Sequence, residues 1–137
     1  MTTTDTTTRD RIIECLEAAD YPALVDLFAP DALLDMNLPT WRFQHQGTDE
    51  IRAYLEAQTT GMPNLHCTYI RDISTDDAVV VESECRFDRN GGEYLWRAVD
   101  IFTLAGGKVT NHSQYCTGCS TPQDIARQRV EAPMVRW

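Results

Sequence analysis

Four β-rich runs separated by tight-turn signals fill most of the second half of this 137-residue chain, and no other feature restricts the fold as strongly. The runs are residues 65–73, 77–88, 92–104 and 108–117. Between them stand turn-forming pairs and triplets, namely Asp76-Asp77, Asn90-Gly91-Gly92 and Gly106-Gly107. Because strands joined by short turns usually pair with their neighbours in opposite directions, these runs predict an antiparallel meander.

The first half of the chain predicts three helices. The first begins at Arg9, where apolar residues recur at helical spacing with charged residues on the other side. In the second, Asp20 is the expected N-cap, Pro22 lies in the first turn and Pro30 marks the end. The third covers residues 48–61, with acidic side chains in its first turn.

One strand and one further helix complete the expected elements. Residues 32–38 alternate as a strand does, which places Leu34, Met36 and Leu38 on one face. Residues 120–133 have a capping Ser-Thr pair, an early proline and a closing proline, as a short helix does.

Together these elements predict an α+β fold. We expect a cone-shaped α+β barrel, in which three N-terminal helices pack on a strongly curved mixed or antiparallel sheet and a short C-terminal helix follows. Residues 1–8 are rich in threonine, have no apolar face to bury, and are predicted to be a disordered tail. Residues 9–137 are then one domain, because a chain of this length rarely divides into two.

The charge balance argues against two classes of partner. The chain has 12 basic and 21 acidic residues, a net charge of −9, and no cluster of Lys and Arg. Nucleic acid and anionic membranes would be repelled, so we expect neither as a partner. No apolar run approaches the roughly 20 residues that cross a bilayer, and the polar start lacks the pattern of a signal peptide. The expected location is cytoplasmic.

The chain has five cysteines, an odd number, and we expect mostly reduced thiols. Cys116 and Cys119 form a CxxC pair, which can bind a metal or cycle as a dithiol. A zinc site needs four ligands, and His112 or His66 would have to supply the others. We therefore favour a structural role, with Cys116 packed inward and Cys119 starting the turn into the last helix, and expect no metal and no cofactor.

Two stretches resemble the nuclear transport factor 2-like superfamily, especially its SnoaL-like and ketosteroid-isomerase-like members. Residues 18–35 have the family's helical hairpin leading into its first strand. Residues 97–115 are similar to its D-x-F-x-x-x-G-K-V hairpin, carried here by Asp100, Phe102, Gly107, Lys108 and Val109. The resemblance covers about residues 9–116 and implies the cone fold. It leaves the reaction open, because the fold serves isomerases, dehydratases, polyketide cyclase-like enzymes of secondary metabolism, epoxide hydrolases and binding modules.

Strand alternation predicts which side chains share the inner face. Trp96, Ala98, Asp100 and Phe102 point one way from their strand, whereas Arg97, Val99 and Ile101 point the other way. His112, Gln114 and Cys116 share a face of the next strand. The resemblance implies that these are the cavity faces, so we predict Asp100 and His112 as a catalytic acid/base pair that exchanges a proton near neutral pH. The alternative is a purely structural hydrogen bond between the two.

Several positions depart from the isomerase pattern. The resemblance places Met36 where those enzymes have their base and Ile12 where they have an oxyanion tyrosine, which argues against steroid isomerisation by their mechanism. Gln114 stands where epoxide hydrolases need a carboxylate. The predicted substrate-binding residues are Trp96, Phe102, Met36, Leu34, Gln114, Cys116, His45 and Trp41.

We therefore predict an enzyme of the lyase, isomerase or cyclase type that acts on a small apolar metabolite without metal or organic cofactor. A non-catalytic ligand-binding or accessory protein and an epoxide hydrolase remain the alternatives. The resemblance also implies a homodimer, formed through an outer sheet face with Val99, Ile101 and Val81. Met134 and Trp137 of the C-terminal tail are predicted to close the cone or line the dimer edge.

Overall fold

The computed structural model describes residues 3–135, and the side chains of residues 8–135. The elements in chain order are α1 (Thr3–Ala18), α2 (Tyr21–Val25), β1 (Phe28–Leu38), β2 (Trp41–Gln46), α3 (Thr48–Thr60), β3 (His66–Ser74), β4 (Ala78–Arg89), β5 (Gly92–Ala105), β6 (Lys108–Cys116) and α4 (Pro122–Glu131). The six strands form one sheet in the order β2-β1-β6-β5-β4-β3. This is the predicted α+β cone, with the predicted meander over β3 to β6.

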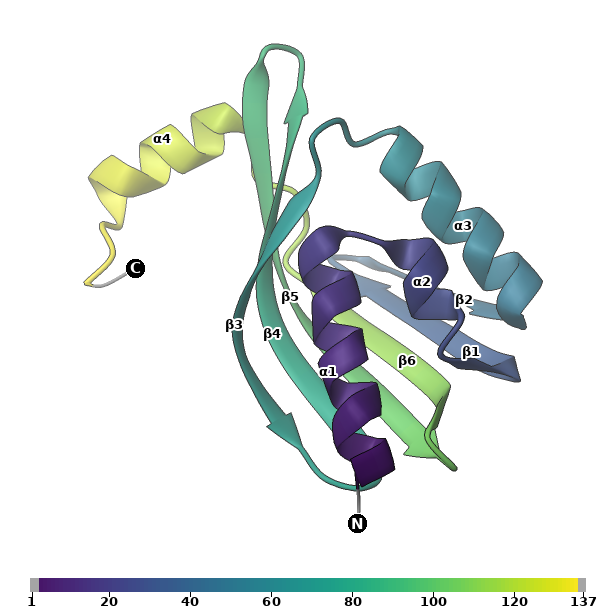
Figure 1. Cartoon of the computed structure of the whole chain (residues 1–137). Coiled ribbons are helices and arrows are strands. Elements are labelled where there is room, and N and C mark those ends of the chain that lie inside the picture. The colour runs from purple at the N-terminus through teal and green to yellow at the C-terminus, as the bar shows by residue number, and fades with distance from the viewer. Residues whose placement is uncertain (1–2, 136–137) are drawn as a thin grey trace.

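The sheet curls strongly, and α1, α2 and α3 cover its concave side (Figure 1). Strand β1 pairs in parallel with β6, whereas the other neighbouring pairs are antiparallel. The main core lies between the three helices and the concave face. Its fully buried members include Ile12 of α1, Leu24 of α2, Ile51 of α3 and Leu34 of β1.

Helix α1 begins at Thr3 rather than at Arg9, so it extends into the threonine-rich segment that was predicted as a disordered tail. Residues 1 and 2 of that tail lie outside the described residues. The threonine-rich segment ends against the sheet, where the buried Thr8 hydroxyl donates a hydrogen bond of 3.1 Å to the carbonyl oxygen of Gly107. This contact with the β5–β6 turn is not visible in local sequence composition.

Strand β1 is longer than predicted, because Pro30 does not end a helix. Helix α2 is capped as expected by Asp20, whose side chain accepts from the Ala23 N–H, but it ends at Val25. Pro30 lies where the pairing of β1 with β6 shifts register, between Phe28 and residue 33. A proline lacks the N–H of a regular ladder and is tolerated at such an irregularity.

Strand β2 was not predicted. A two-residue turn of Pro39 and Thr40 connects it to β1, and Leu38 pairs with Trp41 directly across the turn. Thr40 has a φ of 64°, a left-handed conformation that is unusual for threonine. The Pro39-Thr40 turn has neither the Asn-Gly nor the Asp-Gly sequence that normally indicates a hairpin, so β2 had no signal in the sequence.

The outer face of the sheet is a charged ladder that includes Glu82, Glu84 and Arg86 of β4. Glu82 accepts from Arg71 at 2.6 Å, and Glu84 accepts from Arg86 at 2.7 Å. Val99 and Ile101 face outward as expected, but Val81 does not: it is 1% exposed. Val81 lies directly opposite the inward-facing Asp100, and residues opposite one another in an antiparallel pair share a face.

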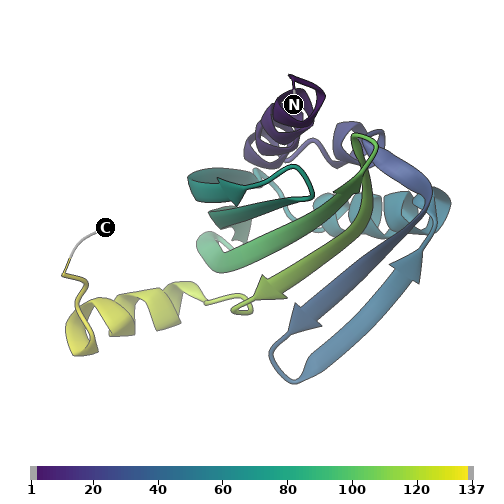
Figure 2. The ribbon, with the colours of Figure 1, turned by 90° about the horizontal axis from the view of Figure 1, so that it is seen from below.

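Helix α4 forms as predicted and projects away from the body of the cone (Figures 1 and 2). Thr121 and Asp124 form a capping box at its start. None of its side chains is buried. Met134 follows it, is 38% exposed and accepts a weak hydrogen bond of 3.9 Å from Gln128 of the same helix. Its role at the cone or at the dimer edge stays a prediction. Trp137 lies outside the described residues.

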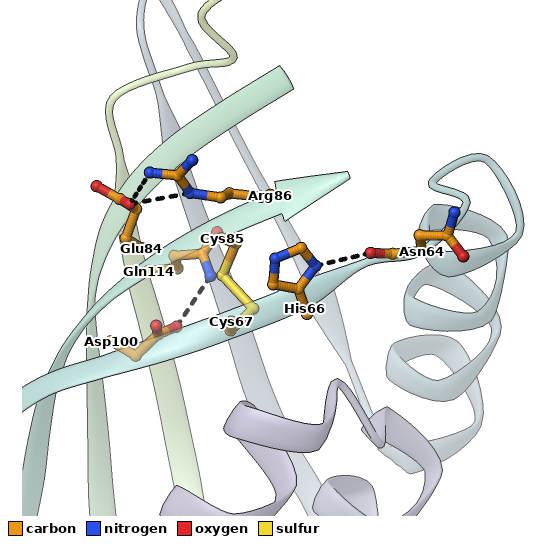
Figure 3. The surroundings of a disulfide bond; sticks show 8 residues. All are labelled: Asn64, His66, Cys67, Glu84, Cys85, Arg86, Asp100 and Gln114. Atoms are coloured by element: carbon orange, nitrogen blue, oxygen red, sulfur yellow. Dashed lines mark hydrogen bonds and ion pairs between the residues drawn. A yellow bond between two sulfur atoms is a disulfide. The ribbon is translucent and has the colours of Figure 1, made fainter. Parts of the chain in front are cut away.

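Cys67 of β3 and Cys85 of β4 form a disulfide (Figure 3). The expectation of reduced thiols is therefore wrong for this pair, although it holds for the three free cysteines Cys15, Cys116 and Cys119. Cys67 and Cys85 are paired directly across two antiparallel strands, and only the register of β3 on β4 brings them together.

Within the described residues, no helix is both long and apolar enough to span a membrane.

Thiol titration tests the disulfide. In denaturant without reductant, we expect three reactive thiols per chain, and after reduction all five cysteines should react. A double variant with Cys67→Ser and Cys85→Ser should give the same count under both conditions. Five reactive thiols in the unreduced protein would contradict the assignment.

The Arg9–Asp72 ion pair anchors α1 to β3 and predicts a pH-dependent stability. The Arg9 guanidinium donates to both Asp72 oxygens at 2.9 and 2.8 Å, and the Tyr69 and Ser74 hydroxyls donate to the same carboxylate. The hydrogen bonds from Arg9, with smaller contributions from Tyr69 and Ser74, hold the pKa of Asp72 well below its ordinary value. The stabilisation is therefore present above the unfolded-state pKa and is lost as pH falls toward the folded-state pKa.

We expect Asp72→Asn to lower the free energy of unfolding at neutral pH by about 2 kcal/mol, because charged hydrogen bonds are lost at a buried site. The difference from wild type should shrink below a pH of about 4, where the unfolded-state carboxyl protonates. Urea unfolding across this pH range measures both effects. Asp10→Asn is the matched control: Asp10 also pairs with Arg9 but is 52% exposed, so its loss should have little effect. Equal stability of Asp72→Asn and wild type would refute the anchor.

Candidate functional site

A cavity of about 220 Å³ lies on the concave side of the sheet. Its apolar lining includes Leu16, Leu34, Met36, Leu38, Leu55, Met62 and Leu65, and its polar or aromatic lining includes Tyr21, Tyr54, Gln58, Trp96, His112, Gln114, Cys116 and Cys119. The described lining residues include neither Lys nor Arg. The site is therefore an apolar chamber with a few polar groups, as small-molecule sites commonly are.

Asp100 and His112 meet beside this cavity, on β5 and β6. The distance between His112 Nε2 and Asp100 Oδ1 is 2.7 Å, and both side chains are almost completely buried. Gln114 donates from its side-chain amide to the same oxygen at 2.9 Å (Figure 3). The β5–β6 register explains the cluster, because Asp100 lies opposite Gln114 and Phe102 lies opposite His112.

The imidazole ring of His112 contacts two aromatic rings. It stacks on Phe102 at a centroid distance of 4.1 Å and meets the edge of Phe28 at 6.0 Å. Across β1, its neighbour is Leu34. Packing on these sides fixes the ring plane, so Nε2 stays directed toward Asp100.

This arrangement favours one tautomer of a neutral His112. The Asp100 oxygen that accepts from the Gln114 amide belongs to a carboxylate, which accepts hydrogen bonds and does not donate them. Nε2 of His112 therefore carries the hydrogen, and the lone pair lies on Nδ1. His112 Nδ1 is buried and has no hydrogen-bond partner among the described residues. His112 lines the cavity, whereas Asp100 lies behind His112 and Gln114. Chemically, His112 can accept a proton and Asp100 can stabilise the resulting cation.

Tyr21 is a lining residue that the sequence did not suggest as a site residue. It is the first residue of α2, directly after the Asp20 cap, and reaches the cavity from the helical side. Burial and, to a smaller extent, the negative charge of Asp100 raise the pKa of the Tyr21 hydroxyl far above its ordinary value. The hydroxyl therefore stays protonated and can donate a hydrogen bond. Tyr54 also lines the cavity, and burial raises its pKa as well.

Of the eight residues predicted to bind substrate, Trp96, Met36, Leu34, Gln114 and Cys116 do line the cavity. Phe102 is fully buried and supports the His112 ring without lining the cavity. His45 and Trp41 lie on β2 and are not lining residues either. His45 stacks on Tyr54 at 4.9 Å, and Trp41 is 67% exposed. The prediction of these two as substrate-binding residues is not supported, because pairing with β1 places them on β2, the edge strand of the sheet.

The CxxC pair does not gather further metal ligands in the described part of the chain. His66 is exposed and contacts the carbonyl oxygen of Asn64 at 2.9 Å (Figure 3), and His112 pairs with Asp100. No group of three or more His, Cys, Asp or Glu side chains among the described residues is arranged to hold a metal ion. Burial raises the pKa of the Cys116 thiol, so this thiol remains protonated and is a weak nucleophile.

Solved structures similar to this chain share its fold. One is an NTF2-like protein of unknown function from Cytophaga hutchinsonii, with 21% identity over 80% of this chain and 96% of that chain, and a TM-score of 0.67. Another is a phenazine biosynthesis-related protein from Pseudomonas aeruginosa, with 15% identity, coverage of 98% and 91%, and a TM-score of 0.70. A third is an LEH-like epoxide hydrolase from M. tuberculosis, with 15% identity, 84% coverage of both chains and a TM-score of 0.63.

The sequence itself also matches a family. There is no significant match among curated proteins. The SnoaL-like domain family matches residues 10–112, which include every strand from β1 to β5, and its match ends at His112. The match covers most of the chain and its structural neighbours have the same NTF2-like fold, so one conclusion follows: the chain belongs to the SnoaL-like domain family.

Proposed function

We propose that this protein is a cofactor-independent enzyme that moves a proton on a small, largely apolar molecule, with a reaction of the lyase, isomerase or cyclase type. The observation that carries the proposal is the buried Asp100–His112 pair beside an apolar cavity, with His112 Nδ1 left without a partner. A histidine held in one tautomer by a carboxylate is a common general base.

In the proposed reaction, the Nδ1 lone pair of neutral His112 removes a proton from an acidic C–H group of the bound molecule. The electron pair of that bond moves toward an adjacent electron-withdrawing group. Asp100, whose Oδ1 accepts from Nε2–H, stabilises the imidazolium. The protonated Tyr21 hydroxyl is available to stabilise developing negative charge. Returning the proton to another atom completes an isomerisation, and loss of a leaving group completes an elimination.

Two alternative functions fit parts of the site. An epoxide hydrolase has a weaker basis, because Gln114 replaces the carboxylate such enzymes need and donates its amide to Asp100. A non-catalytic binding protein is favoured by Met36, an apolar lining residue at the position of the isomerase base. In that case Asp100 and His112 would only satisfy one another inside the core.

Proton transfer can be measured without the natural substrate, by following the exchange of carbon-bound hydrogen for deuterium in small ketones in heavy water by NMR. We expect His112→Gln and Asp100→Asn to slow this exchange by roughly a hundredfold to ten-thousandfold, the usual contribution of general acid–base catalysis. His45→Gln is the matched control, because His45 does not line the cavity and its exchange rate should equal that of wild type.

Wild-type exchange rates in both His112→Gln and Asp100→Asn would refute the proposal. Tight binding of a ketone without any exchange above the uncatalysed rate would instead favour the binding-protein alternative. Folding of each variant is checked by its thermal unfolding transition.

We further propose that the chain forms a homodimer through the outer face of the sheet, and that it acts in the cytoplasm. Val99 and Tyr115 are neighbours on that face and are 37% and 53% exposed. Covering them would remove apolar surface from water.

Light scattering should therefore give the mass of two chains, and Val99→Asp should give that of one. Val130→Asp, on the exposed side of α4, is the control and should leave the mass unchanged. A wild-type mass of one chain would refute the dimer.

A further inference from the structure

Two buried side-chain polar atoms in the described part of the chain have no hydrogen-bond partner, and both belong to residues that line the cavity. One is His112 Nδ1, to which the proposed reaction gives a role. The other is Nε1 of Trp96, which the proton transfer does not use. Leaving a buried donor unpaired costs about 1–3 kcal/mol, so such an atom requires an explanation.

The indole ring of Trp96 is held in place by its neighbours. Trp96 lies on β5 opposite Cys85 of β4, whose sulfur is bonded to Cys67. Its ring lies 5.7 Å from that of Phe87, and the residue is only 7% exposed. Because the ring is enclosed in this cluster, its N–H group does not reach bulk solvent. Because Trp96 also lines the cavity, a molecule bound there can be the partner of this N–H group.

The chemistry of the site limits what that partner can be. An indole N–H is a donor only, so its partner must be an acceptor. An anion is disfavoured, because the described lining has no Lys or Arg and the carboxyl group of Asp100 lies behind it. The charged group of a metal ion or an ammonium ligand has no lone pair with which to accept from the indole. The remaining class is an uncharged molecule with an acceptor oxygen on a mostly apolar frame.

We propose that Trp96 is a specificity-determining residue, whose indole N–H donates a hydrogen bond to the carbonyl oxygen of an uncharged, otherwise apolar ligand. This inference rests on the proposed function only in assuming that the cavity binds a small molecule. It adds that the molecule has a carbonyl group and that Trp96 recognises this group. A hydrocarbon of the same shape leaves the donor unpaired and binds more weakly.

The test compares α-tetralone with tetralin, which has the same bicyclic frame without the carbonyl oxygen. In a two-dimensional proton–nitrogen NMR spectrum, α-tetralone should move the indole signal of Trp96 downfield, as a new hydrogen bond does, and tetralin should not. Trp96→Phe identifies this signal among those of the three tryptophans. Trp41→Phe is the matched control, because Trp41 is 67% exposed and does not line the cavity.

NMR titration gives the affinity of both compounds for each variant. In wild type we expect α-tetralone to bind about tenfold more tightly than tetralin, equivalent to about 1.4 kcal/mol. Trp96→Phe should abolish this preference and Trp41→Phe should preserve it. The loss of side-chain volume in Trp96→Phe affects both compounds alike, so the ratio of the two affinities isolates the hydrogen bond. If Trp96→Phe fails to fold, Trp41→Phe and Trp137→Phe together assign the wild-type Trp96 indole signal by elimination, and its shift still decides.

Three results would overturn the inference: an unmoved Trp96 signal when α-tetralone binds, an unchanged preference in Trp96→Phe, or no binding of α-tetralone to wild type. The first two leave the proposed proton transfer intact, because the exchange assay of His112→Gln and Asp100→Asn tests it separately. Conversely, a Trp96 shift together with unaltered exchange in those variants would support the ligand class and refute the catalytic role of the pair.

Discussion

The parallel pairing of β1 with β6 is the contact on which the rest of the cone depends. It joins the hairpin that follows the N-terminal helices to the meander formed by the second half of the chain. Across it, Leu34 lies opposite His112 and Met36 lies opposite Gln114. The apolar floor of the cavity and its polar wall therefore come from opposite ends of the sequence. Neither half of the chain forms the cavity alone.

Burial of Asp100 is acceptable only because the same fold supplies its partners. Removing a carboxylate from water costs several kcal/mol unless donors replace the solvent. His112 and Gln114 both direct nitrogen atoms at one of its oxygens, and Phe102 packs on the histidine ring. In such apolar surroundings a hydrogen bond to a charged group is stronger than at the surface. The interactions that hold the pair in the core are thus also those that would prepare it for proton transfer.

The inner faces of β5 and β6 were predictable because side chains alternate strictly along a strand. Alternation groups the side chains of each face, and the family resemblance implied that the faces with Asp100 and His112 line the cavity. The same rule turns Val81 inward, because it directly precedes the outward-facing Glu82 on β4, and its position opposite Asp100 agrees with this. Tyr21 could not be predicted as a lining residue, because its direction depends on how α2 packs over the sheet. The Cys67–Cys85 disulfide likewise depends on register.

By itself the sequence determined the α+β class, the order of most elements and which side chains share a face of each strand, because propensity, capping and periodicity are local properties. The cone was inferred from the order of those elements, and the family from the two stretches that resemble it. Tertiary structure decided which polar atoms meet and which remain unpaired. The 2.7 Å contact of His112 with Asp100 and the unpaired nitrogens of His112 and Trp96 arise from register and packing between distant segments. Such contacts depend on three-dimensional distance, which no local pattern encodes.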